Sequence, residues 1–191
     1  VLDEESPGIR PLGGAAKWWL HGSLQSLGER LSERGSTLVL RRGAAASVVP
    51  AVADEASAGA VYWNRRYGGA ERDVDAALKA SLREDGLTVA SFGASLLFEP
   101  WTVQTGSGTP YSVFTPFWRA CQAMPTPRAP LPDPRSIPGP RSAPQSDDLD
   151  DWRLLPTEPD WAGGLRATWD PGEPAARARL RQFLADDLAD Y

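Results

Sequence analysis

Apolar residues in the first half of the chain recur with two different periods, one helical and one strand-like. Over residues 12–34 they return every three or four positions, as on one face of an amphipathic helix, and Gly35 can end that helix. Residues 37–40 are β-branched or aliphatic and predict a buried strand. A second helix is expected over residues 48–56, with Pro50 in its first turn.

This alternation of helix and strand continues along the chain. Residues 59–63 predict a strand that leads into a polar loop at 64–67, residues 70–84 predict a helix, and residues 87–92 predict a further strand. Helices that alternate with strands in this way indicate an α/β fold. We expect a mostly parallel, Rossmann-like sheet with helices packed on both faces.

Beyond Phe92 the pattern changes to short pieces, between residues 96 and 114, that fit extended segments best. The turn residues at 106–108 predict a hairpin more strongly than a phosphate-binding loop, because no helix follows them directly. Residues 117–123 predict a short helix with Pro116 in its first turn.

Proline changes the character of the chain after this helix. Eight of the 18 prolines lie in residues 125–144, which excludes regular helix or a central strand and favours an extended linker. The acidic stretch 147–160 carries large apolar residues, among them Trp152 and Leu154, that we expect to anchor it on a folded surface. The expected parts are an α/β domain at 1–124, a linker at 125–170 and, at 171–191, the first helix of an all-α domain.

The composition excludes several kinds of site. His21 and Cys121 are the only residues of their types, so a Cys/His zinc cluster and an intrachain disulfide are impossible, and a reducing compartment is favoured. A net charge of -5 gives no basic field that attracts nucleic acid. No apolar run approaches the roughly 20 residues of a membrane span. Val1 begins neither a signal peptide nor an initiator segment, so we expect a fragment.

Three arginines surround the loop that follows the strand ending at Trp63, and they are Arg65, Arg66 and Arg72. Ligands of open α/β sheets bind outside the carboxyl ends of strands, so residues 64–72 are the best candidate for a cleft, with an ordinary surface loop as the alternative. No glycine motif for pyrophosphate is present. Asp73 and Asp75 on the next helix point to different faces, and we expect them to be solvated.

Five segments, in their order and spacing, resemble the family of DNA photolyases and cryptochromes. They are KWWLHGSL at 17–24, LVLRRG at 38–43, VYWNRRY at 61–67, SLLFEP at 95–100 and VFTPFW at 113–118. The closing residues 180–191 are similar to the family as well. The resemblance therefore covers about the first 120 residues and the end of the chain.

The resemblance implies a deoxyribodipyrimidine photolyase, a carbon–carbon lyase of DNA repair. In that family an N-terminal α/β domain carries a light-harvesting antenna chromophore, and a helical domain binds FAD and DNA that contains pyrimidine dimers. Light-excited reduced FAD gives an electron to a cyclobutane dimer flipped from the DNA, the dimer splits and the electron returns. We expect a cytoplasmic monomer without membrane contact.

The same resemblance implies that the first strand lies ahead of Val1 and nearly the whole FAD domain beyond Tyr191. This chain alone is therefore expected to be inactive in repair. It is also expected to be marginally stable, because the first strand is central in such sheets and its loss uncovers apolar faces of its neighbours.

Two cofactor-binding residues follow from the resemblance, whereas no catalytic residue and no metal ligand are expected here. Glu71 matches a glutamate that hydrogen-bonds the pterin in folate-type photolyases. The family has asparagine where this chain has Ala70, which leaves a reduced folate, a deazaflavin, a flavin or no antenna open. Tyr191 matches a tyrosine whose hydroxyl contacts an FAD phosphate.

Two other functions stay open beside DNA repair. A cryptochrome-type blue-light photoreceptor shares this half of the sequence with the photolyases. A non-catalytic, nucleotide-binding α/β module is the third possibility, but a long proline-rich tail that leads into a fresh helix argues against it.

Overall fold

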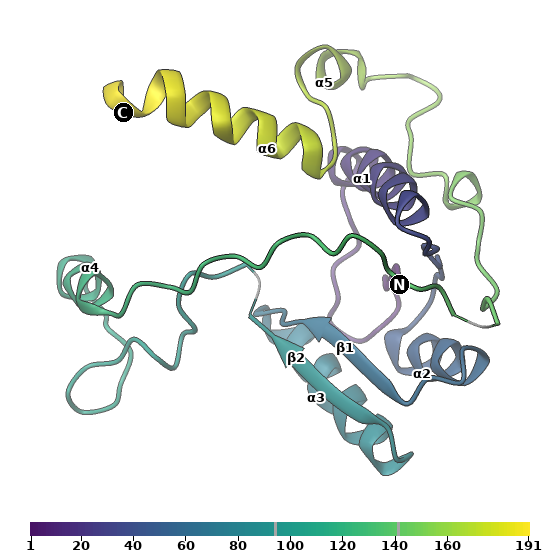
Figure 1. Ribbon diagram of the computed structural model, residues 1–191, viewed down its shortest axis with the longest axis horizontal. Helices are drawn as coiled ribbons and strands as arrows, with labels where there is room; N and C mark the ends of the chain where they lie inside the picture. Colours follow the sequence, from purple (N-terminus) through teal and green to yellow (C-terminus); the bar gives the residue numbers. More distant parts are fainter. Residues whose placement is uncertain (94, 141) are drawn as a thin grey trace. The chain divides into compact units, whose positions relative to one another are not determined.

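The computed structural model describes residues 1–93, 95–140 and 142–191 (Figure 1). The chain forms two compact units. Unit 1 contains Val1–Gly59 and Pro134–Tyr191, and unit 2 contains Ala60–Asp133, which lies between those two segments in sequence. The domain limits expected at residues 124 and 170 stay predictions.

A parallel pair of strands and one helix form the centre of unit 2. The elements are β1 (Ala60–Asn64), α3 (Gly69–Glu84) and β2 (Thr88–Phe92). Ala60 pairs with Thr88, and the register continues to Asn64 and Phe92. In Figure 1 the two strands lie side by side and α3 lies against them. The strand, helix and strand predicted for residues 59–92 are confirmed to within one residue at each end.

Apolar side chains bury the contact between α3 and β2. Leu82 is fully buried, and Leu78 and Val89 are almost as inaccessible to solvent. Gly86 has a φ of +83°, a left-handed conformation that lets the chain turn sharply from the end of α3 into β2. Of the apolar positions that set the helical period of residues 70–84, Leu78 and Leu82 are buried, whereas Ala77 is exposed.

In the described part of the rest of unit 2 there is one helix, α4 (Phe114–Ala123). It begins three residues earlier than expected, and Pro116 lies in its first turn as predicted. The turn at 106–108 forms, with the Thr105 N–H donating to the Thr109 carbonyl over 2.8 Å. The prediction of a hairpin is wrong. Among the described residues, from which Ala94 is left out, no strand flanks the turn.

Helices dominate unit 1. They are α1 (Gly14–Glu33), α2 (Ala45–Glu55), α5 (Gly163–Thr168) and α6 (Glu173–Gln182), with the short helical turns η1 (Asp150–Trp152), η2 (Phe183–Asp187) and η3 (Leu188–Asp190). The expectation of a helix over residues 12–34 is confirmed by α1. The expectation of Pro50 in a first turn is wrong, because α2 already begins at Ala45 and Pro50 lies in its second turn.

The strand predicted at residues 37–40 is not part of a sheet. The segment is extended and only half-buried, and its neighbours are single residues instead of a strand. Leu2 forms one parallel bridge with Arg42, and the Asp147 N–H donates to the Leu40 carbonyl over 2.7 Å. A β-ladder needs several consecutive residues that pair with a neighbouring strand, and among the described residues no strand pairs with residues 37–40 in this way.

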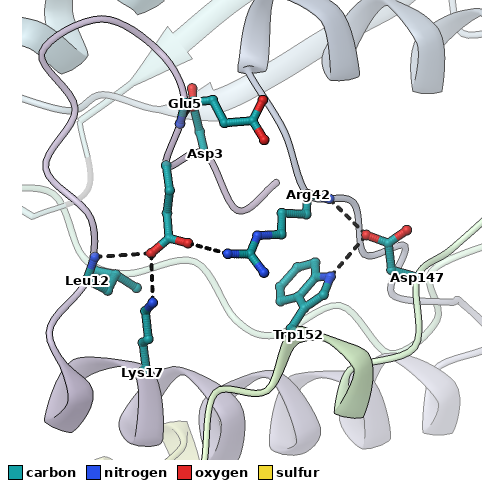
Figure 2. Close-up of polar contacts among 8 residues, drawn as sticks. Asp3, Glu5, Leu12, Lys17, Arg42, Asp147 and Trp152 are labelled. Carbon is teal, nitrogen blue, oxygen red and sulfur yellow. Dashed lines mark hydrogen bonds and ion pairs between the residues drawn. The ribbon is translucent and has the colours of Figure 1, made fainter.

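Glu4 ties three parts of unit 1 together through Leu12, Lys17 and Arg42, which are labelled in Figure 2. One carboxylate oxygen lies 3.2 Å from Lys17 Nζ on α1 and accepts the Leu12 N–H over 3.3 Å. The other oxygen accepts a hydrogen bond of 2.8 Å from the Arg42 guanidinium. The carboxylate is well shielded from solvent, with 10% of the side chain exposed, so these charges interact more strongly than surface pairs do.

Asp147 fastens the acidic segment to the same region. Its Oδ2 accepts the Arg42 backbone N–H over 2.9 Å and the Trp152 indole N–H over 3.0 Å, as Figure 2 shows. Trp152 and Leu154 then pack with Leu2 in the buried core. The expectation that apolar residues anchor this acidic stretch is confirmed for Trp152 and Leu154.

Two acidic residues near the N-terminus have pKa values below their ordinary values. Burial opposes ionisation of Asp3, but donors from Ser6 and the Ala45 N–H, with one more backbone donor, together lower the pKa. Burial likewise opposes ionisation of Glu4, and Lys17 leads the partners that lower its pKa. The native state therefore holds both carboxylates in the charged form.

Replacing Trp152 tests the anchor. We expect Trp152→Ala to lower the free energy of unfolding by about 3–5 kcal/mol, because it opens a large cavity in the core. Trp152→Phe keeps most of the packing but loses the bond to Asp147, and should cost about 1 kcal/mol. Urea unfolding followed by circular dichroism measures both. The control is Leu131→Ala, at a side chain that is 77% exposed. An equal loss of unfolding free energy in this variant would contradict the anchoring role of Trp152.

The pH dependence of stability tests the Glu4 network. The pKa of Glu4 is lower in the folded than in the unfolded protein, so ionised Glu4 stabilises the folded state. This stabilisation is complete above the ordinary pKa of 4.5 and is lost as the pH falls through the lower pKa of the folded state. Glu4→Gln should therefore lower the melting temperature most at neutral pH, by a destabilisation on the order of 1 kcal/mol, and least in acid. Exposed Glu29→Gln on α1 is the control. A difference in melting temperature between Glu4→Gln and wild type that stays constant with pH would count against the network.

Candidate ligand-binding cavity

A cavity of about 300 Å³ lies at the carboxyl ends of the strands of unit 2. The loop after β1 forms one wall and α3 forms another. Arg72, Asp75 and Lys79 are three and four positions apart on α3, so the same face of the helix presents all three. The cleft predicted at residues 64–72 is confirmed, and the lining residues from that segment are Arg65, Arg66, Tyr67 and Arg72.

Glu99 holds the loop after β1 in place. Its Oε1 accepts two hydrogen bonds from the Arg65 guanidinium, of 2.8 and 3.2 Å, and its Oε2 accepts the Tyr67 hydroxyl over 2.9 Å. Arg65 also donates to the Ser91 carbonyl of β2 over 2.9 Å. The hydrogen bond to Glu99 raises the pKa of Arg65 above its ordinary value, so the arginine stays charged.

A second ion pair joins the loop to α3. Arg66 donates two hydrogen bonds to Asp75 Oδ1, of 2.5 and 3.2 Å, and the Asp75 side chain is 16% exposed. Our expectation that Asp75 is solvated is therefore wrong, because it turns toward the loop that crosses over this face of the helix. Asp73 is exposed, as expected, at the edge of the same cavity.

Two tryptophans give the cavity flat walls. Trp63 is half-buried, and Lys79 Nζ lies 5.5 Å from its ring centroid while donating to Ser91 Oγ over 2.7 Å. The Arg65 guanidinium lies 5.3 Å from the centroid of the Trp101 ring, which is 54% exposed. Cations over indole faces are attracted by the ring quadrupole, so these contacts fix the positions of the rings and the charges together.

The lining carries more positive than negative charge. Four basic and two acidic side chains line the cavity. Glu99 neutralises Arg65 and Asp75 neutralises Arg66, whereas neither Arg72 nor Lys79 pairs with a carboxylate in the described part of the chain. The cavity can therefore accept a planar ligand with an anionic group.

A larger cavity in unit 2, of about 460 Å³, has different chemistry. Apolar side chains dominate its wall, with Leu97 and Trp118 exposed and Cys121 buried. The burial of Cys121 agrees with our interpretation of it as a small hydrophobic residue. Outside the two undescribed positions, no group of three His, Cys, Asp or Glu residues has the arrangement of a metal site.

Glu71 and Tyr191, the two residues predicted to bind cofactors, lie outside both cavities. Glu71 is half-buried in the first turn of α3, and its carboxylate rests against Gly68, which has no Cβ to obstruct it. Tyr191 is 98% exposed, with its ring centroid 5.8 Å from that of Phe183. Their expected roles stay predictions.

Sequence reasoning missed the residues that organise the cavity from outside the loop. Glu99 belongs to a segment quoted for the family resemblance, but nothing in its neighbours predicts two partners more than thirty positions away. The helical period of residues 70–84 predicted the helix that contains Lys79, but no role for its side chain. The spacing of Arg72, Asp75 and Lys79 on one face was a usable signal, because it places three charges beside the predicted cleft.

The chain is similar to known proteins along its whole length. The family model described as DNA photolyase matches residues 1–135. A deoxyribodipyrimidine photo-lyase of Agrobacterium fabrum is 46% identical over 190 residues, covering 100% of this chain and 39% of that protein. Cryptochrome-1 of Arabidopsis thaliana is 32% identical over 196 residues, covering 100% of this chain and 28% of that protein.

A solved structure agrees with these sequence matches. The crystal structure of a bacterial class III photolyase from Agrobacterium tumefaciens superimposes with a TM-score of 0.90 at 44% identity, over 96% of this chain and 38% of that one. The predicted α/β class of the fold is thereby confirmed. The chain spans well under half the length of these relatives.

Replacing Glu99 tests what holds the loop. We expect Glu99→Leu to release Arg65 and Tyr67 together, so backbone amides of residues 65–68 should exchange hydrogen roughly threefold to tenfold faster. Hydrogen–deuterium exchange followed by mass spectrometry measures this. Glu84→Gln, at an exposed position at the end of α3, is the control. Unchanged exchange in the Glu99 variant would show that the loop is held by other contacts.

Proposed function

This chain belongs to the DNA photolyase family, and from that membership we propose that the full-length protein is a light-driven, FAD-dependent deoxyribodipyrimidine photolyase. The observation that carries the proposal is the 46% identity to a protein of that name over the whole of this chain. The chemistry that a reduced flavin supplies when bound is donation of one electron under light, and its return after the two carbon–carbon bonds of the dimer have broken.

In this proposal the present chain serves as the part that binds the antenna chromophore. Its own residues support that role, since the cavity of unit 2 combines flat indole walls with fixed cations at the carboxyl ends of the strands. Glu71 is proposed to accept hydrogen bonds from ring N–H groups of a pterin, as a carboxylate can. Ala70 leaves a reduced folate, a deazaflavin, a flavin or no antenna open.

The described residues offer little to FAD or DNA. Tyr191, the proposed contact to an FAD phosphate, is exposed and its ring packs edge-on against that of Phe183. The net charge of -5 is unsuited to a phosphate backbone, so we propose that DNA with pyrimidine dimers binds to a region outside this chain. A cytoplasmic location and a monomeric state stay predictions.

A cryptochrome-type photoreceptor is the second candidate. The match to cryptochrome-1 over 100% of this chain supports it, at lower identity than the match to the photolyase. The family match argues against the third possibility of an unrelated nucleotide-binding module.

Light-dependent repair decides between the two candidates. We expect the purified full-length protein to carry flavin and, after reduction, to restore thymine dimers in an irradiated oligonucleotide under blue light but not in darkness. Loss of the dimers is followed by chromatography. The matched control is the same protein with its flavin removed. Flavin bound without any light-dependent repair would assign the protein to the cryptochrome type.

A further inference from the structure

One row of residues on α1 receives a much later segment of the chain, within unit 1. Residues four positions apart on a helix lie on one face, and this row consists of Gly14, Trp18, Gly22, Ser26 and Arg30. Residues 160–173, here named the strap, begin with Trp161 against Gly14 in the first turn of α1 and end with Glu173 against Arg30 in the last. The strap therefore follows most of the length of α1, in the same direction.

Two glycines of the row leave room for side chains of the strap. A Cβ at Gly14 would lie 2.7 Å from an atom of the Trp161 ring, and a Cβ at Gly22 would lie 2.8 Å from the Pro171 side chain. Atoms at such distances repel each other strongly, so a methyl group at either glycine would push the strap away from α1. The close fit of the strap thus depends on hydrogen atoms at these two positions.

Further contacts fix the point where the strap enters α6. The Trp169 ring meets the Trp19 ring edge-on, with 6.0 Å between the centroids. Gly172 has a φ of +111°, which residues with a side chain rarely adopt. Glu173, the first residue of α6, forms an ion pair with Arg30, and α6 begins beside α1 in Figure 1. The position of α6 is therefore set by the contacts of the strap.

These contacts are few for the length of the strap. Of its residues, all of which the structure describes, only Ala162 is buried, and the side chains of Trp161 and Trp169 are 48% and 41% exposed. In the described part of the chain, no backbone hydrogen bond joins the strap to α1. Trp152 and Leu154, just before it, are by contrast buried in the core of unit 1. Few buried contacts and an exposed backbone are typical of a segment that opens locally.

We propose that the strap is a conformational device that detaches from α1 as one unit, while the rest of unit 1 stays folded. Its fixed end is Leu154, and α6 moves with its other end. In the closed state the strap and α1 line a cavity of about 340 Å³, with Trp19, Ser23 and Ser26 on its wall, and opening exposes that wall to solvent. A partner that holds α6 away from α1 shifts the strap toward the open state, because it binds that state better.

Hydrogen–deuterium exchange of the full-length protein tests the strap through α5. This helix has six residues, too few to persist alone, so exchange of its amides reports whether the strap is docked. We expect Gly22→Ala to speed exchange in α5 roughly tenfold and to leave residues 150–153 unchanged. Gly28→Ala on the same helix is the control, because its methyl group would lie 3.8 Å from the nearest atom, in the Leu38 side chain, which is ordinary contact.

A second substitution shows whether the fit at Gly22 is the cause. Pro171→Gly removes the atoms that a methyl group at position 22 would meet. In the Pro171→Gly protein, Gly22→Ala should therefore change the exchange in α5 less than twofold. If Gly22→Ala does not fold, Trp169→Ala decides the question in the same way, since it removes the contact with Trp19 without adding atoms, and should speed exchange in α5 roughly threefold.

Three results would overturn the strap as a separate unit. They are an unchanged exchange in α5 of Gly22→Ala, an equal effect of Gly22→Ala with and without Pro171, and an equal acceleration in α5 and in residues 150–153. The measurement needs no light, no DNA and no reduced flavin. Absence of repair therefore overturns the photolyase assignment alone, and the strap stands or falls by its own exchange.

Discussion

The geometry of the cavity in unit 2 depends on one carboxylate, that of Glu99. Its two oxygens bind different residues of one loop, Arg65 and Tyr67, so the segment after β2 and the loop after β1 are fixed to each other. Arg65 extends this link to the backbone of β2 and to the Trp101 ring. The loop also has a backbone hydrogen bond of its own, from the Arg65 N–H to the Phe92 carbonyl over 2.9 Å. Together with the shared carboxylate this orders the loop, as a binding site at the end of a sheet requires.

The sequence pattern predicted the secondary-structure elements around this site but not the side-chain contacts that hold the loop in place. The spacing of apolar residues in 59–92 was sufficient for β1, α3 and β2, because burial of one helix face and two strands is a local property of the pattern. The rule that ligands bind beyond strand ends then located the loop. The pairing of Glu99 with Arg65 and Tyr67 depends on which side chains the fold brings together, and neither spacing nor residue type predicts it.

The strand predicted at residues 37–40, which does not form, also shows that local sequence does not reveal which segments the fold brings together. Its β-branched and aliphatic residues suit a strand, but strand formation also requires a neighbouring strand, and here the backbone of Leu40 bonds to the Ser146 hydroxyl and the Asp147 N–H instead. The family resemblance, by contrast, rested on the order of five motifs and did not depend on any single element being right. It therefore survived errors in local structure that would have misled an argument from the fold alone.

The core of unit 1 joins residues that are far apart in the sequence, with Leu2 packed on Trp152 and Leu154. On the ribosome, β1, α3 and β2 leave the exit tunnel long before those partners of Leu2 have been translated. Unit 2 can thus fold early from contacts that are close in sequence, while the N-terminal segment stays open until the acidic stretch emerges. Nascent chains that stall between the two events expose apolar surface, and chaperones recognise such surface.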